Sequence, residues 1–122
     1  MPLTKEQFVE QLGRDFPESD PIIEEHRRDM DGEVLLHLLA ADVLRLAIEL
    51  FEANEIDTLD RCLNVVATGL AEGDEYVNNA IAVSFVEDTP WWDETKFPFI
   101  AVWPEALRVE AERFRAASGG ST

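Results

Sequence analysis

The sequence predicts an all-α fold, a compact domain of five to six antiparallel helices in a HEAT-like stack of hairpins or an irregular bundle. Apolar residues recur at the spacing of amphipathic helices along most of the 122 residues. No segment shows the strict alternation expected of a half-buried strand. Cap and turn signals separate the apolar stripes at short intervals, as between antiparallel neighbours. The length fits one domain, assigned to 1–117, followed by a linker-like tail at 118–122.

Two helices are expected near the N-terminus. Thr4 and Gln7 match a capping box and predict a helix over about 4–16. Asp20 followed by Pro21 predicts the start of the next one, with Asp20 as the cap. The inward face of this second helix is expected to hold three residues: Ile22, Ile23 and His26.

The longest helix is expected over 33–53, after an interruption at Gly32, and Asn54 closes it. Its apolar residues cover most of the circumference, which predicts a central helix with neighbours on several sides. A clearly polar face is marked by only four residues: Asp42, Arg45, Glu49 and Glu52.

Two more helices are predicted over about 58–71, capped by Asp57 or Thr58, and over about 75–87 after a turn at 72–74. The buried face of the second is expected to hold Tyr76, Val77, Ala80, Ile81, Ser84 and Phe85.

All three tryptophans lie in TPWWDETKFPFIAVWP, residues 89–104. The prolines prevent this stretch from forming one helix, so it is expected to cover the core as an irregular segment. Phe99 and Trp103 are assigned to the core, and 100–102 to at most a short extended piece. The last helix is expected to begin at Pro104, with Trp103 as its cap and Val102 and Leu107 as a hydrophobic staple.

Trp91 and Trp92 are adjacent and cannot easily both face inward. One is expected to pack and the other to be partly exposed beside Asp93 and Glu94. An exposed tryptophan among carboxylates suits the cation of a basic partner.

The net charge of −16, from 26 acidic and 10 basic residues, is the most unusual property of the chain. It argues against direct binding to nucleic acid or to anionic membranes, and it permits fast association with a basic protein. The simpler alternative is that the charge only keeps the protein soluble. Residues 1–60 hold 16 of the acidic residues, and within them Asp29, Asp31 and Glu33 are the predicted recognition face.

The single cysteine, Cys62, the lack of a leader-like N-terminus and the lack of a membrane-length apolar run predict a cytoplasmic protein. No active site is predicted. Glu33 and His37 could present two metal ligands, but no further motif accompanies them. Cys62 lies on an apolar stripe, as a small core residue would. The chain is therefore expected not to be an enzyme and to need no cofactor.

A resemblance rests on AEGDEYVNNAIAVSFVED (71–88), the tryptophan-rich stretch and WPEAL (103–107). Over about 33–110 the chain resembles a group of small acidic helical bacterial proteins, several of which look like immunity proteins of polymorphic or contact-dependent toxin systems. The resemblance implies a non-enzymatic protein that binds a cognate toxin in the cytoplasm and blocks its active site.

Three hypotheses follow. The first is an immunity-type protein, a monomer or weak dimer, that neutralises a basic nuclease toxin. The second is an acidic nucleic-acid mimic or adaptor that binds a host nucleic-acid enzyme. The third is a small enzyme or metal protein that uses Glu33 and His37.

Overall fold

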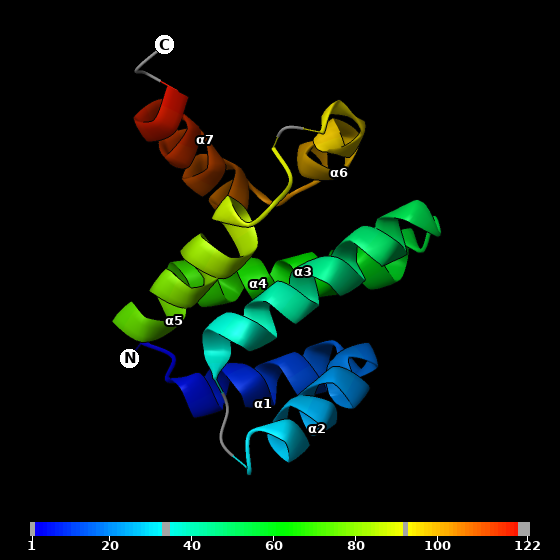
Figure 1. Ribbon diagram of the computed structural model, residues 1–122, viewed down its shortest axis with the longest axis vertical. Helices are drawn as coiled ribbons and strands as arrows, with labels where there is room; N and C mark the ends of the chain where they lie inside the picture. The colour runs from blue at the N-terminus through cyan, green and yellow to red at the C-terminus, as the bar shows by residue number, and fades with distance from the viewer. Residues whose placement is uncertain (1, 33–34, 92, 120–122) are drawn as a thin grey trace.

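The computed structural model describes residues 2–32, 35–91 and 93–119 and confirms the all-α fold. Figure 1 shows three layers along the long axis: α1 and α2 at the bottom, α3, α4 and α5 in the middle, and α6 and α7 at the top. The bounds of the helices are Lys5–Asp15 (α1), Asp20–Asp29 (α2), Leu36–Glu52 (α3), Ile56–Glu72 (α4), Glu75–Ile81 (α5), Phe97–Ala101 (α6) and Glu105–Gly119 (α7).

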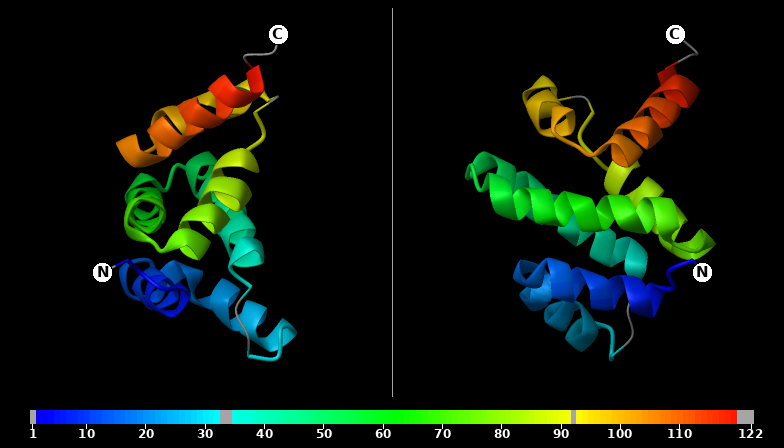
Figure 2. Two further views of the ribbon diagram at one scale, coloured as in Figure 1. Left: turned by 90° about the vertical axis from the view of Figure 1, so that its left-hand side faces the viewer. Right: turned by 180° about the vertical axis from the view of Figure 1, so that it is seen from behind.

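Within these residues there are seven α-helices rather than five or six, because α6 forms where a short extended piece was predicted. Helix length differs from layer to layer. The first layer has helices of 11 and 10 residues (α1 and α2), the middle layer has α3 and α4 with 17 each, and the last layer has α6 with 5 and α7 with 15. Figure 2 shows the stacked layers from two further sides.

The start of α1 is as predicted, and the start of α2 is not. The Thr4 hydroxyl accepts from the backbone of Gln7, and the Gln7 side chain accepts from the backbone of Thr4, so the capping box is present. Asp20 is the first residue of α2 rather than its cap. A short 3-10 turn, η1 (Pro17–Ser19), leads directly into this helix and leaves Ser19 at the cap position, where its hydroxyl donates to the Phe16 carbonyl at 2.7 Å.

The two long helices form the middle layer and pack on each other. Asn54, in the turn between them, adopts a left-handed conformation with φ of 61°, which ends α3 as predicted. The next helix, α4, begins at Ile56, so Asp57 and Thr58 lie inside its first turn and neither caps it. Turn geometry at Asn54, rather than a capping side chain, fixes the start of α4.

The predicted helix over 75–87 is one continuous rod made of two helical types. After Ile81, α5 continues as the wider π-helical segment η2 (Ala82–Glu87). Val77, Ala80, Ile81 and Phe85 are buried as predicted. The assignment of Tyr76 to the buried face was wrong, since its side chain is 42% exposed. Its polar hydroxyl lies at the edge of the helix pair, 3.3 Å from the backbone N–H of Leu36.

The turn before α5 is joined to the N-terminus by a connection that the sequence did not indicate. Leu3 N–H donates to the Glu72 carbonyl and Asp74 N–H donates to the Leu3 carbonyl, both at 2.8 Å. This isolated bridge fixes the chain ahead of α1 against the end of α4. The bridge therefore helps to hold α1 in its position against the middle layer.

The side chain of Asp74 caps α5 by accepting from Val77 N–H at 2.9 Å. We expect Asp74→Ala to lower the free energy of unfolding by about 1 kcal/mol, because one N–H of the first turn loses its acceptor. Asp74→Asn keeps an acceptor oxygen and should lose less. Urea denaturation measures both, and equal losses would show that the charge of Asp74, not its hydrogen bond, is what matters.

The tryptophan-rich stretch covers the core, as predicted, but its middle part, 94–101, is helical. A 3-10 turn, η3 (Glu94–Lys96), leads into α6, which includes Ile100 and Ala101. Phe99 and Trp103 are buried at 0% and 2% exposure. The predicted staple is absent, because Val102 is 46% exposed while Leu107 is fully buried. The final helix begins at Glu105, one residue later than expected, and includes residues 118 and 119 of the predicted tail.

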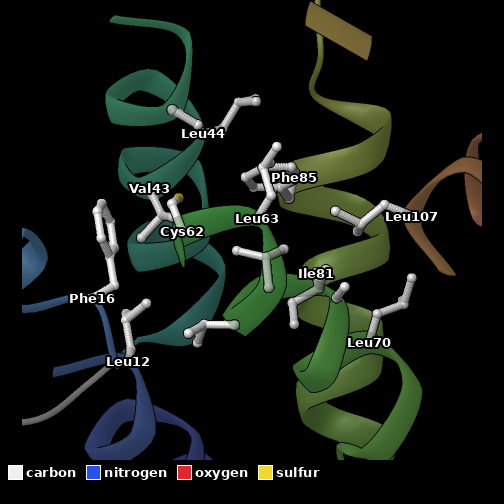
Figure 3. Packing of buried hydrophobic residues seen from close by; sticks show 14 of the residues in the cluster. Leu12, Phe16, Val43, Leu44, Cys62, Leu63, Leu70, Ile81, Phe85 and Leu107 are labelled. Atoms are coloured by element: carbon white, nitrogen blue, oxygen red, sulfur yellow. The ribbon is translucent and has the colours of Figure 1, made fainter. Parts of the chain in front are cut away.

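One apolar core connects the layers. Figure 3 shows how side chains from α1, α3, α4, η2 and α7 meet in it. The packing partners are α1 with α4, α2 with α3, and α7 with both α4 and η2. The long helix α4 thus contacts both the first layer, through α1, and the last layer, through α7.

Candidate functional site

A groove of about 680 Å³ lies between α2 and α3, and we call it the α2–α3 groove. Its apolar lining consists of Pro21, Ile22, Met30, Leu38, Ala41 and Leu46. Its acidic lining consists of Glu18, Glu25, Asp29, Asp42 and Glu49. One guanidinium, that of Arg45, is also present. The groove therefore combines an apolar surface with a strong excess of negative charge.

Helical periodicity places these residues together. Glu18, Ile22, Glu25 and Asp29 follow one another at intervals of three or four residues along η1 and α2. Such residues lie on one face of a helix. On α3, Leu38 and Asp42 begin a row that continues through Arg45 and Glu49. The groove is the space between these two rows.

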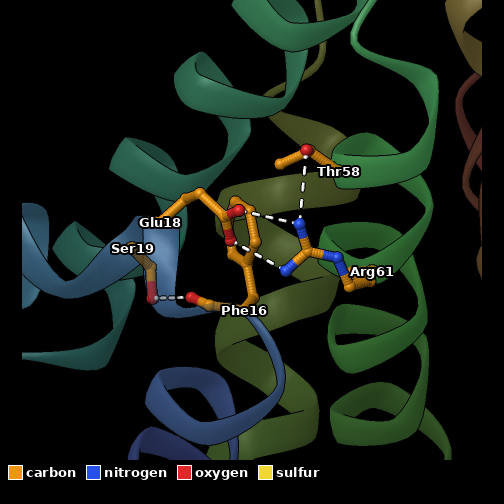
Figure 4. Close-up of polar contacts among 5 residues, drawn as sticks. All are labelled: Phe16, Glu18, Ser19, Thr58 and Arg61. Carbon is orange, nitrogen blue, oxygen red and sulfur yellow. Dashed lines mark hydrogen bonds and ion pairs between the residues drawn. The ribbon is translucent and has the colours of Figure 1, made fainter.

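Two of the five carboxylates already have a basic partner. Arg61 on α4 donates to both oxygens of Glu18, at 2.9 and 2.7 Å, and is also 3.3 Å from the Thr58 hydroxyl (Figure 4). The hydrogen bonds from Arg61 lower the pKa of Glu18. Asp42 pairs with Arg45, one turn away on α3. Both pairs lie near the solvent, where such pairs contribute little to stability.

The other three carboxylates carry uncompensated charge. Glu25, Asp29 and Glu49 form no ion pair with any described residue, and all three are exposed. Two of them project from α2 and one from α3, so negative charge lines both walls. Arg45 cannot neutralise them while it pairs with Asp42.

The wall formed by α2 is fixed to the start of α3. His26 is 6% exposed, as the sequence predicted for an inward residue, and its Nε2 accepts from Leu35 N–H at 2.8 Å. This hydrogen bond joins the last turn of α2 to the residue that precedes α3. The relative position of the two walls therefore depends on a buried contact as well as on packing.

The predicted acidic recognition face is only partly in the groove. Asp29 lines it, whereas Asp31 lies in the following turn with φ of 59° and is not part of the lining. Glu33 falls outside the described residues. The three were predicted from sequence proximity alone, and the end of α2 separates the first from the others.

The described residues of the predicted tryptophan face lie outside the groove, where the chain leads through η3 into α6 (Figure 1). Trp91 is half-buried, donates from Nε1 to the Val86 carbonyl at 3.0 Å, and already has Arg115 over its ring at 5.6 Å. A partner's cation would have to displace Arg115 to use this ring. Trp92 falls outside the described residues.

The two acidic residues of that face differ in their surroundings. Asp93 accepts from the backbone and the hydroxyl of Thr95, at 3.0 and 2.6 Å, and these bonds lower its pKa. Glu94 is exposed in η3. Asp93 therefore has a structural role in starting η3, and the predicted tryptophan face does not join the α2–α3 groove.

Comparison with known proteins identifies the family of this chain. The model of one family, described as a domain of unknown function (DUF7674), matches residues 9–116. The chain belongs to this family. No curated protein and no solved structure matches it. The matched region of the DUF7674 domain includes both walls of the groove and the tryptophan-rich stretch, and the family description assigns neither of them a function.

The residues of the DUF7674 domain that the sequence offered as possible metal ligands are Glu33 and His37. His37 Nδ1 lies 3.1 Å from the Ser84 hydroxyl on η2, with the Tyr76 ring 6.0 Å away. The other member of the predicted metal pair, Glu33, is outside the described residues, and the described ones contain no group of three or more side chains able to hold a metal. Along the described chain, no helix has the length and apolar character to cross a membrane.

The sequence did not single out Leu38, Glu25 or Glu49 as site residues. Leu38 lies on the helix whose apolar residues were expected to be covered by neighbours on several sides, but it is 48% exposed. One signal was present: Leu38 precedes Asp42, Arg45 and Glu49 at helical spacing, so it heads the polar row.

Cys62 of α4 is fully buried, and burial raises the pKa of its thiol to about 12, from an ordinary value of 9.0. The thiol is therefore protonated at neutral pH and a poor nucleophile. We expect an aromatic disulfide reagent to label the Cys62 thiol of the native protein extremely slowly and that of the urea-unfolded protein at once. Rapid labelling of the native protein would contradict the packing around Cys62.

Proposed function

We propose that this DUF7674 protein is a cytoplasmic immunity-type inhibitor that binds and neutralises a cognate, basic nuclease toxin. The observation that carries the proposal is the α2–α3 groove, where Glu25, Asp29 and Glu49 project unpaired charge around an apolar lining. Apolar lining gives a protein partner an area to bury, and the carboxylates select a basic one. A negative charge that only kept the protein soluble would not require an apolar groove lining beside the carboxylates.

Nuclease domains bind phosphates through clustered Lys and Arg, so an acidic protein can occupy the same surface. The charge of the chain then increases the rate of association and makes it sensitive to salt. Five of the ten basic residues form ion pairs within the described structure, which leaves the negative charge of the surface largely unopposed.

Co-expression tests this function. A toxin encoded immediately beside this chain should kill cells when expressed alone and should be harmless when the chain is expressed with it. The complex should be stoichiometric, and its association should slow as salt is added. A toxin that still kills in the presence of the folded chain would refute the proposal. Recovery of many nucleic-acid-binding proteins that all dissociate at moderate salt would favour the nucleic-acid mimic instead.

A further inference from the structure

We infer that the α2–α3 groove receives an amphipathic basic helix of the partner, about three turns long, whose apolar side packs on Leu38 and Ile22. This inference rests on the proposed function, because it takes the partner to be a basic protein. It adds the shape and the charge pattern of the segment that binds.

The shape of the groove favours a helix. Both walls are helical faces, and a third helix packs into the space between two helices with its side chains in their grooves. The wall formed by α2 is 10 residues long, or about 15 Å, which matches a segment of about three turns. Such a segment presents apolar anchors at positions i, i+3 or i+4, and i+7.

The apolar lining favours burial by a protein side chain. Leu38 is 48% exposed although it lies on the central helix, and Ile22, Met30 and Leu46 beside it are partly exposed. A leucine or isoleucine from the partner would remove this surface from water, which is favourable because apolar surface is transferred out of water.

The distribution of charge in the groove determines which residue types must flank the apolar row of the bound helix. Glu25 and Asp29 stand on the wall formed by α2, and Glu49 stands on the wall formed by α3. Lys or Arg is therefore required on both sides of the apolar row. A second copy of this chain is disfavoured as the occupant, because two molecules with a charge of −16 repel each other. Phosphate groups are repelled for the same reason.

A labelled peptide of Leu and Lys, with its leucines on one helical face, is the direct probe. Fluorescence anisotropy with the full chain should show saturable binding at low salt. A scrambled peptide of the same composition, with its leucines spread around the helix, should bind at least about tenfold more weakly, because it cannot match the apolar lining. Equal binding of the two peptides would overturn the inference in favour of unspecific charge attraction.

Matched charge reversals locate the site. Glu25→Lys with Glu49→Lys should weaken binding of the amphipathic peptide at least about tenfold. Glu87→Lys with Glu112→Lys changes the net charge equally at exposed residues outside the groove, and should weaken it by no more than about twofold. Thermal unfolding would verify that both variants are folded. Equal losses in the two variants would contradict the groove as the site.

The same pairs of variants separate this inference from the proposed function. A toxin neutralised equally well by the wild type and by the Glu25→Lys, Glu49→Lys variant would overturn the groove and leave the function standing. A chain that binds the amphipathic peptide in the groove but does not protect cells from the neighbouring toxin would overturn the function and leave the groove standing.

Discussion

Trp103→Ala is expected to lower the free energy of unfolding by about 3–5 kcal/mol, the largest effect of any single substitution considered. Trp103 is 2% exposed, and its ring lies 5.7 Å from those of Phe85 and Phe99 and 6.1 Å from that of Trp91. It therefore joins η2 to α6 and to the segment between them. Alanine would leave a cavity that no neighbouring element can fill. Urea denaturation monitored by circular dichroism measures the loss.

Trp103→Phe is the matched control. The indole Nε1 of Trp103 is buried without a hydrogen-bond partner among the described residues, and phenylalanine removes this unpaired donor while it keeps an aromatic ring. The loss should therefore be small, about 1–2 kcal/mol. An alanine variant no less stable than the phenylalanine variant would mean that Trp103 does not hold these elements together.

Gly69→Ala is expected to destabilise the protein by about 1–3 kcal/mol, although alanine is the better helix former. Gly69 lies inside α4, where α1 and α5 both approach closely. A Cβ at this position would lie 2.4 Å from the Phe8 ring and 2.6 Å from Ile81 Cδ1. Both side chains are buried, so neither can move away without disturbing the core.

Gly13→Ala provides the comparison of opposite sign. Gly13 lies in α1, and the nearest atom to an added Cβ would be Asp20 Oδ1 at an ordinary contact distance of 3.4 Å. The substitution should stabilise the protein by about 0.5–1 kcal/mol through helix propensity. If Gly69→Ala were also stabilising, the three helices would not approach at Gly69 as closely as the structure shows.

Most of the helices could be predicted from the sequence because their signals are local. The capping box at Thr4 and Gln7 and the turn before Asp74 depend on residues close together in the chain. The predictions failed where two local signals competed. Pro98 indicated an irregular segment, but proline is tolerated in the first turn of a helix, and α6 begins at Phe97. Asp20 matched a cap, but the preceding 3-10 turn occupies that position.

The candidate site was less predictable because it depends on contacts between distant segments. Glu18 pairs with Arg61, 43 residues away, and His26 bonds to Leu35 across a turn. The first contact neutralises one carboxylate of the groove, and the second ties the end of α2 to the start of α3. Asp29 was named from the sequence and lines the groove, whereas the placement of Glu25 and Glu49 on facing walls requires the packing of α2 on α3.

The proposed inhibition of a basic nuclease is tested most directly by titration. A basic nuclease encoded beside this chain is titrated with the purified chain. We expect nuclease activity to fall in proportion to added chain and to vanish at one chain per nuclease. Glu25→Lys with Glu49→Lys should shift the titration to a large excess of chain. Full nuclease activity in the presence of excess folded wild-type chain would contradict the proposed inhibition.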